Sequence, residues 1–317
     1  GDVYKRQAIQ SINIQSGIFC LMKDRFQDII WVGADGQGIY MYFTDEFSIE
    51  NVLLDVPEYR VNNPVRALFL DHEQTLWIGT KGGGILRMMD FHPDRETLPQ
   101  AERILANNSA LMDNSVYSFA PGRRNSLWIG TEDGLNYYSY LTRRIEEFPV
   151  IADGKKVKYV HSICETNDST LWVVSAGEGI VKITLEASSS LPKVKSAQRF
   201  TLDGGKRNSN YFFVSYQEND STIWFGNRGY GAYKMNTRTN QLTPCRIDDV
   251  VKNQTVNDIF AIHKNDEGYW FGTSFGLTRL YQGEYRVYNE TDGFPNNTIH
   301  GILEGRDNNL WLSTNQG

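Results

Sequence analysis

The sequence predicts an all-β fold, a seven-bladed β-propeller of four-stranded antiparallel blades. Three observations predict it: all the tryptophans lie in one repeated context, the repeat averages about 47 residues, and short runs of Val, Ile, Phe and Tyr alternate with Gly, Asn and Asp. Periods of about 40–50 residues are typical of propeller blades or helical arrays, and strand-and-turn composition favours blades. The repeats are marked by Trp31, Trp77, Trp128, Trp172, Trp224, Trp270 and Trp311.

The first strand of each unit is expected about 14 to 8 residues before its tryptophan. These segments are nearly continuous in apolar and small residues, as expected for a strand that is buried on both faces. Such a strand suits the innermost position of a blade, beside the central axis. The clearest examples are residues 63–71, 114–120, 210–216 and 296–303.

The second strand carries the tryptophan, whose large indole is expected to pack between neighbouring blades. A glycine-rich hairpin then leads to the third strand, because glycine adopts positive φ without steric cost. A weaker fourth strand ends each unit, as at 198–203 and 284–289, and two insertions, 90–100 and 185–196, lengthen the connection before it. The hairpin glycines follow their tryptophan by seven residues at Gly38, Gly84, Gly179 and Gly231, and by six at Gly134 and Gly276.

One blade cannot bury both of its faces alone, so residues 17–317 are expected to form a single domain of seven repeats. The seventh unit contains a first strand and Trp311, but the sequence ends six residues later. We therefore expect an incomplete last blade in this chain and a longer natural protein. Residues 1–16 are expected to hold a strand that closes the ring and a non-native start, since residues 1–7 resemble a translated sequencing adapter.

Charge and composition exclude several functions. With a net charge of −6 and no basic block, the chain lacks the positive patch of a nucleic-acid binder. It has no stretch of about 18 apolar residues, so we expect no direct membrane contact. The three cysteines lack metal-ligand spacing, and neither H-E-x-x-H nor G-x-S-x-G occurs. The sequence therefore predicts no metal, no cofactor and no catalytic residues.

Propellers commonly bind ligands at the mouth of the central channel, on the face shared by the loops into the first strands and the hairpins between second and third strands. The residue eleven positions before each tryptophan is expected at this mouth. Arg, Tyr and His side chains there would offer donors and stacking surfaces to a sugar or a sugar acid. These residues are Cys20, Arg66, Tyr117, His161, Phe213 and His300, with Phe260 in the equivalent place of the Trp270 unit.

Hairpins on the same face add further side chains, namely Lys81, Glu132, Asp133, Arg228, Tyr230 and Phe275. Each candidate also has a structural interpretation: a histidine can be packed in the core, an arginine can bridge two blades, and an aromatic ring can simply fill space. The candidate ligand-binding residues are Arg66, Tyr117, His161, Arg228, Tyr230 and His300.

The motif L-W-I-G-T followed by G-G-I-L-R, which includes Trp77, Gly79 and Arg87, resembles the two-component regulator propeller repeat. The segment around Trp128 matches the same motif closely, and the weakest copies surround Trp172 and Trp311. The resemblance covers essentially residues 17–317, since both the local motif and its sevenfold recurrence agree.

The resemblance implies the periplasmic, extracytoplasmic sensor of a hybrid two-component regulator, which senses oligosaccharides and signals to a membrane histidine kinase outside this chain. It also implies a second propeller and downstream domains of the same polypeptide as partners, and a homodimer of the full-length protein. Two alternatives stay open: a propeller glycoside hydrolase or lyase, and a scaffold that binds only proteins. The first would need the arginine triad and Tyr–Glu nucleophile of sialidase-like propellers, which we cannot assemble from this sequence.

Overall fold

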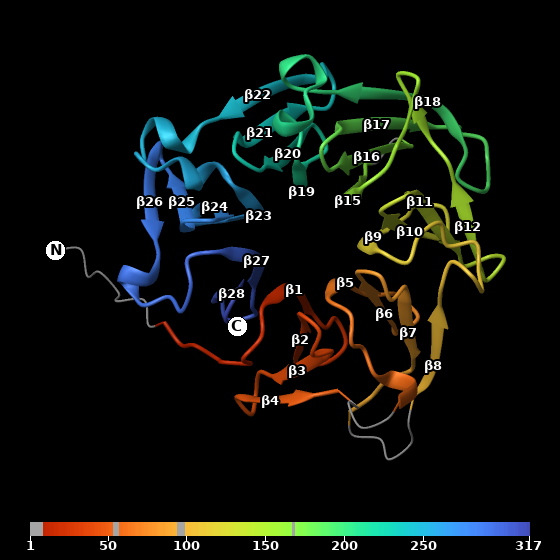
Figure 1. The fold of residues 1–317 in the computed structure, drawn as a ribbon, viewed down its shortest axis with the longest axis horizontal. Coiled ribbons are helices and arrows are strands. Elements are labelled where there is room, and N and C mark those ends of the chain that lie inside the picture. The colour runs from red at the N-terminus through yellow and green to blue at the C-terminus, as the bar shows by residue number, and fades with distance from the viewer. Residues whose placement is uncertain (1–8, 53–56, 94–98, 167–168) are drawn as a thin grey trace.

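A computed structural model describes residues 9–52, 57–93, 99–166 and 169–317. The chain runs through a succession of antiparallel sheets that circle a central axis, with the first strand of each sheet innermost (Figure 1). Residues 1–7, the expected non-native start, lie outside the described residues.

Six sheets are four-stranded blades in which sequential strands pair from the axis outward. The first blade contains β1 (Ile18–Lys23), β2 (Ile29–Ala34), β3 (Ile39–Phe43) and β4 (Ser48–Asn51). The second contains β5 (Val65–Leu70), β6 (Thr75–Thr80), β7 (Ile85–Met89) and β8 (Gln100–Ile104). The third contains β9 (Val116–Pro121), β10 (Ser126–Thr131), β11 (Gly134–Ser139) and β12 (Arg144–Phe148).

The fourth blade contains β15 (Val160–Glu165), β16 (Thr170–Ser175), β17 (Gly179–Leu185) and β18 (Val194–Phe200). The fifth contains β19 (Phe212–Asn219), β20 (Thr222–Asn227), β21 (Gly231–Asn236) and β22 (Gln241–Cys245). The sixth contains β23 (Ile259–Asn265), β24 (Gly268–Thr273), β25 (Gly276–Tyr281) and β26 (Glu284–Tyr288).

The expected count of seven blades, with the last one incomplete, is wrong, because the described residues form six four-stranded blades. The seventh unit forms a two-stranded sheet of β27 (Ile299–Glu304) and β28 (Leu310–Thr314), and the sequence ends three residues after β28. This sheet lies between the sixth and first blades, so it occupies a seventh position around the axis (Figure 1). The strand expected in residues 1–16 is also absent from their described part, residues 9–16.

Short elements connect the blades. A two-stranded hairpin of β13 (Ile151–Ala152) and β14 (Lys155–Lys156) precedes the fourth blade. The helices of the described segments are single 3-10 turns: η1 (Pro57–Tyr59), η2 (Asp203–Gly205), η3 (Arg207–Ser209), η4 (Ile247–Asp249), η5 (Gln254–Asn257) and η6 (Glu290–Asp292).

The core consists of apolar clusters between successive blades, each built around one tryptophan. Trp128 of the third blade, for example, clusters with Val160 and Leu171 of the fourth. The six tryptophans of the complete blades are at most 4% exposed, whereas Trp311 of the two-stranded sheet is only half-buried. Trp311 clusters with Ile18 of the first blade, so apolar packing also joins the two ends of the ring.

Candidate ligand-binding face

All seven innermost strands share a β-bulge at one position. In each strand the pairing with the second strand shifts by one residue close to the strand's start. A bulged residue is left out of the ladder, and the bulge re-aims its side chain. The bulged residues are Phe19, Arg66, Tyr117, His161, Phe213, Phe260 and His300.

These seven side chains, which we call the belt, contact one another in sequence around the axis. The guanidinium carbon of Arg66 lies 4.5 Å from the ring centroid of Phe19 and 5.8 Å from that of Tyr117. Tyr117 stacks on His161 with ring centroids 4.2 Å apart. A cation held over aromatic faces in this way is attracted by their π electrons.

Aromatic contacts continue around the other half of the belt and return to its start. Ring centroids are separated by 5.2 Å between His161 and Phe213, and by 6.4 Å between Phe213 and Phe260. The separations are 5.5 Å between Phe260 and His300, and 5.3 Å between His300 and Phe19. The belt is therefore closed, although one of its seven members comes from the two-stranded sheet.

The first blade places Phe19 in the belt and not Cys20, which was expected there from sequence spacing. The connection from β1 to β2 is one residue longer than in the second blade, so the bulge falls twelve positions before Trp31. Cys20 instead pairs with Gly33 and donates its thiol to the carbonyl oxygen of Val65 at 3.7 Å. Burial raises the pKa of this thiol to about 12, which makes it a poor nucleophile.

The two histidines of the belt are held in the neutral form. Burial, followed by the nearby positive charges of Arg66 and Lys81, lowers the pKa of His161 to about 3. Burial also lowers the pKa of His300, although its Nε2 lies 2.6 Å from Asn315 Oδ1. A neutral imidazole offers one donor, one acceptor and a flat stacking face.

Arg66 contributes the one positive charge of the belt. Within the described ranges it has no carboxylate at ion-pair distance, and its neighbours are the ring faces already named. All the belt residues are half-buried, so part of each side chain meets solvent. The belt therefore presents aromatic faces, two neutral imidazoles and one guanidinium on a single surface.

Arg228 and Tyr230 lie outside the belt, in the hairpin between β20 and β21. Arg228 is exposed, and its backbone forms an isolated bridge with Asp258. Tyr230 is half-buried in the cluster between the fourth and fifth blades, and its hydroxyl accepts a hydrogen bond from Ser209 at 3.3 Å. Of the six candidates, the structure thus brings together Arg66, Tyr117, His161 and His300.

Three residues that sequence reasoning missed lie next to the belt. The Arg207 guanidinium carbon is 5.2 Å from the ring centroid of Tyr159 and 5.5 Å from that of Tyr211, and its Nε donates to the Tyr211 hydroxyl at 2.9 Å. Tyr211 stacks on Phe213 of the belt, with centroids 6.2 Å apart. A sequence signal existed, because both tyrosines lie two positions before a belt residue.

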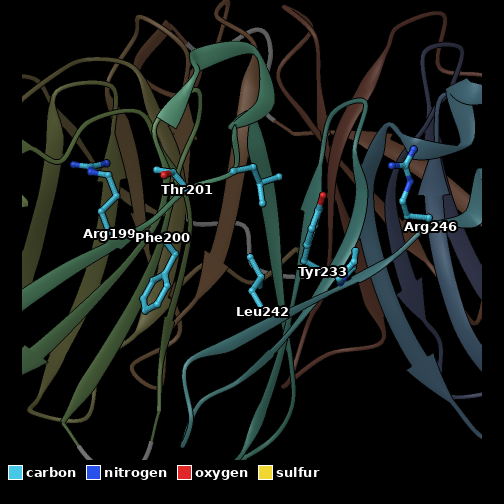
Figure 2. Close-up of a pocket in the computed structure, with 8 residues that line it drawn as sticks. Arg199, Phe200, Thr201, Tyr233, Leu242 and Arg246 are labelled. Atoms are coloured by element: carbon cyan, nitrogen blue, oxygen red, sulfur yellow. The ribbon is translucent and has the colours of Figure 1, made fainter. Parts of the chain in front are cut away.

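Two cavities lie further out, the larger between the fourth and fifth blades and the smaller between the fourth blade and the hairpin of β13 and β14. The larger, about 670 Å3, is drawn in Figure 2 and is lined by Arg199, Phe200, Thr201, Leu202, Tyr233, Leu242, Pro244 and Arg246. The smaller, about 240 Å3, is lined by Asp153, Lys155, Gly177, Glu178, Arg199, Thr201, Gly205 and Arg207. Arg199 and Thr201 line both cavities, which are therefore adjacent.

The described part of the chain contains no cluster of three or more His, Cys, Asp or Glu side chains that could hold a metal ion. None of its helices has the length and apolar character needed to cross a membrane.

Comparison with known proteins supports the repeat motif. The family model described as the two-component regulator propeller matches residues 60–82, 110–133 and 293–316. The third match includes Trp311, whose motif is among the weakest in the chain. Over 181 residues, the chain is 27% identical to Histidine kinase P4 of Formosa agariphila, a match that covers 56% of this chain and 13% of the relative.

Solved structures share the fold. The extracellular domain of the hybrid two-component system BT3049 from B. thetaiotaomicron superposes with a TM-score of 0.76 at 16% identity, over 97% of this chain and 40% of that one. The extracellular domain of the hybrid two-component system BT4673 from the same organism superposes with a TM-score of 0.68 at 19% identity, over 96% of this chain and 38% of that one. The chain therefore spans well under half the length of these relatives. It is a β-propeller, and three of its segments match the two-component regulator propeller repeat.

Proposed function

We propose that this chain is an extracytoplasmic sensor propeller that binds oligosaccharides on the belt face and has no catalytic role. The observation that carries the proposal is the closed belt of aromatic, imidazole and guanidinium groups on partly exposed side chains. Sugars bind such surfaces well, because their C–H faces pack on aromatic rings while their hydroxyl groups hydrogen-bond to nearby polar groups. Matches to extracellular domains of two-component systems support the same function.

The signal would pass to a histidine kinase elsewhere in a hybrid two-component protein of the periplasm and inner membrane. Support comes from the kinase relative, of which this chain matches only a small part. Because seven interlocked sheets move as one body, a bound ligand would act by shifting the propeller against its neighbours. Those neighbours would be a second propeller, the downstream domains of the same polypeptide and the other copy in a homodimer.

We also propose that the seventh unit becomes a complete blade in the full-length protein. Gly317 has φ of +118°, close to the +107° of Gly276, and both follow their tryptophan by six residues. A side chain at Gly276 would meet the carbonyl oxygen of Tyr288, which is the last residue of a fourth strand. A side chain at Gly317 would meet the carbonyl oxygen of Ile12 in the same way. Ile12 thus lies where a fourth strand would end, which leaves room for a third strand beside β28.

Titration of the purified chain with a panel of oligosaccharides, followed by calorimetry, tests the sensing proposal. We expect at least one glycan to bind, and Arg66→Gln to weaken it at least tenfold without lowering the melting temperature. Arg238→Gln, at an exposed arginine in the hairpin between β21 and β22, is the matched control and should bind normally. Turnover of any glycan, or equal binding by both variants, would contradict the proposal.

A further inference from the structure

The guanidinium group of Arg66 has unused bonding capacity. It carries a full positive charge and several N–H donors, and none of its nitrogen atoms bonds to another residue within the described ranges. The faces of Phe19 and Tyr117 hold the group by cation–π contact but leave these donors free. The nitrogens of Arg66 are not among the buried polar atoms that lack a partner, so they reach solvent. A ligand on the belt face can therefore bond to them.

His161 offers a second set of free atoms on the same belt. Its ring stacks on Tyr117 and packs against Phe213. In the part of the chain that the structure describes, neither ring nitrogen makes a hydrogen bond, and neither is a buried atom without a partner. Because the imidazole is neutral, it presents one donor and one acceptor. A hydroxyl group, which both donates and accepts, matches this ring.

Lys81 brings a second positive charge close to these two residues. It follows β6 in the second blade, and its backbone N–H bonds to the carbonyl oxygen of Pro64, two residues before Arg66. Lys81 is exposed, and its ammonium group forms no ion pair with any described residue. After burial, it is the charges of Arg66 and Lys81 that lower the pKa of His161, so both lie near its ring. This part of the belt face is therefore positive.

Carboxylates gather at the Tyr117 hydroxyl instead. Glu132, in the hairpin between β10 and β11, accepts from this hydroxyl at 3.5 Å, and the neighbouring Asp133 is balanced by two lysines. Burial and then the charges of Glu132 and Asp113 raise the pKa of the Tyr117 hydroxyl. The belt face is therefore polarised, with its positive part at the guanidinium and its negative part at the Tyr117 hydroxyl.

We infer that the belt selects glycans that contain a uronic acid, whose carboxylate binds Arg66 while a hydroxyl group of the same glycan bonds to His161. The inference rests on the proposed function for the site and adds the chemical class of its ligand. Hydrogen bonds between an arginine and a carboxylate are charge-assisted and often bidentate, so they are stronger than bonds between neutral groups. A neutral sugar would leave the guanidinium charge without a counter-ion beside apolar rings.

Matched acidic and neutral glycans test the inference. The probes are the trimers of galacturonate, glucuronate and mannuronate, each as the free acid and as its methyl ester, which removes the charge and keeps the sugar rings. Arg66→Gln and Lys81→Gln are the test variants. Their matched controls are Arg238→Gln and Lys195→Gln, at exposed residues of the hairpin after β21 and of the outer strand β18. Calorimetry at low and at high salt gives the affinities, and circular dichroism gives the melting temperatures.

We expect at least one acid to bind the wild type at least tenfold more tightly than its methyl ester, and high salt to reduce this preference. Arg66→Gln should abolish the preference, and Lys81→Gln should reduce it by a smaller factor, because an exposed ammonium group is screened by solvent. Both controls should keep the preference of the wild type. The melting temperatures of all four variants should match that of the wild type.

Equal affinity for acid and ester, or a preference that survives Arg66→Gln, would overturn the acidic ligand class. Should Arg66→Gln melt below the wild type, Lys81→Gln and the salt dependence decide, and an effect of neither would also overturn it. If a neutral glycan binds the wild type and is weakened by Arg66→Gln while no acid is preferred, the belt remains the binding site. If neither acidic nor neutral glycans bind the wild type, the proposed function is wrong as well.

Discussion

Tyr117 and His161, the bulged residues of β9 and β15, stack face to face with ring centroids 4.2 Å apart and an interplanar angle of 13°. They come from neighbouring blades and are one repeat apart in the sequence. The stack places an imidazole in a half-buried setting, with the positive charges of Arg66 and Lys81 nearby. Protonation of His161 would add a third positive charge, so the geometry requires the neutral ring.

Stability should therefore fall in mild acid because of His161. Its pKa is about 3 in the folded chain and 6.5 when unperturbed, so below pH 6.5 the unfolded state binds more protons than the folded state. The free energy of unfolding contributed by this residue is fully present above pH 6.5 and is lost as pH falls toward 3, by at most about 1.4 kcal/mol per pH unit. Urea denaturation at pH 7, 6, 5 and 4 measures it.

His161→Phe keeps a ring that can stack on Tyr117 but does not titrate. Its stability should match that of the wild type at pH 7 within about 1 kcal/mol, as for other volume-conserving changes. Its loss of stability between pH 6 and 4 should be smaller than that of the wild type. Parallel pH profiles for the two proteins would show that His161 is freely protonated in the folded chain.

Trp128→Ala should destabilise the propeller by about 3–5 kcal/mol, because it empties a fully buried site between two blades. It also removes a hydrogen bond of 2.8 Å from the indole nitrogen to Glu165 of the next blade. Trp311→Ala, at the half-buried tryptophan of the two-stranded sheet, should cost less. Chemical denaturation compares the variants, and equal losses would mean that burial does not set the contribution of these rings.

Gly130→Ala should also destabilise, by about 1–3 kcal/mol, through overpacking. A methyl group at Gly130 would lie 2.1 Å from Ser118 Oγ and 2.5 Å from the carbonyl oxygen of Val160 in the next blade. Gly154→Ala is an informative comparison, since it has open space and its cost of about 1 kcal/mol comes from a φ of +76° alone. Should Gly130→Ala prove as stable as the wild type, the blades must be able to move apart at this contact.

The repeat could be predicted from the sequence because its marker residues act locally. An indole buries a large apolar area wherever it lies, and glycine is needed where a hairpin adopts positive φ, as at Gly84 and Gly276. Glycines two positions after a tryptophan were predicted only as part of the pattern. Glycine is needed at these positions because the next blade approaches closely, as it does at Gly130. This is a tertiary contact, which the sequence of one repeat does not reveal.

The candidate site could be predicted only in part. Counting back from the tryptophans located Arg66, Tyr117, His161 and His300. The count works there because the turn between the first and second strands has the same length in these units. The count failed at Phe19, where one extra residue shifts the bulge. Neither the closed belt nor the cavities beside Arg199 could be predicted, since they depend on how side chains from different blades meet.

Glu218 joins the fifth and sixth blades, and its titration gives a final prediction. Its carboxylate accepts from Lys264 at 2.6 Å, from the Tyr269 hydroxyl at 2.6 Å and from Trp224 Nε1 at 2.7 Å. Although burial alone would raise its pKa, these three donors hold the pKa of Glu218 at about 2, below the usual 4.5. The contribution of Glu218 to the free energy of unfolding is therefore fully present above pH 4.5 and is lost as pH falls toward 2.

Glu218→Gln should lower the free energy of unfolding at pH 7 by about 2–3 kcal/mol, as expected when a hydrogen-bonded charge is removed from a mostly buried site. The difference from the wild type should shrink as pH falls from 4.5 toward 2, because the carboxylate of the unfolded wild type is then protonated and must lose its proton when the chain folds. Denaturation at pH 7, 4 and 3 measures both effects. A difference that stays constant across this range would mean that the amide fails for steric reasons, and that the charge of Glu218 adds nothing to the contact between the blades.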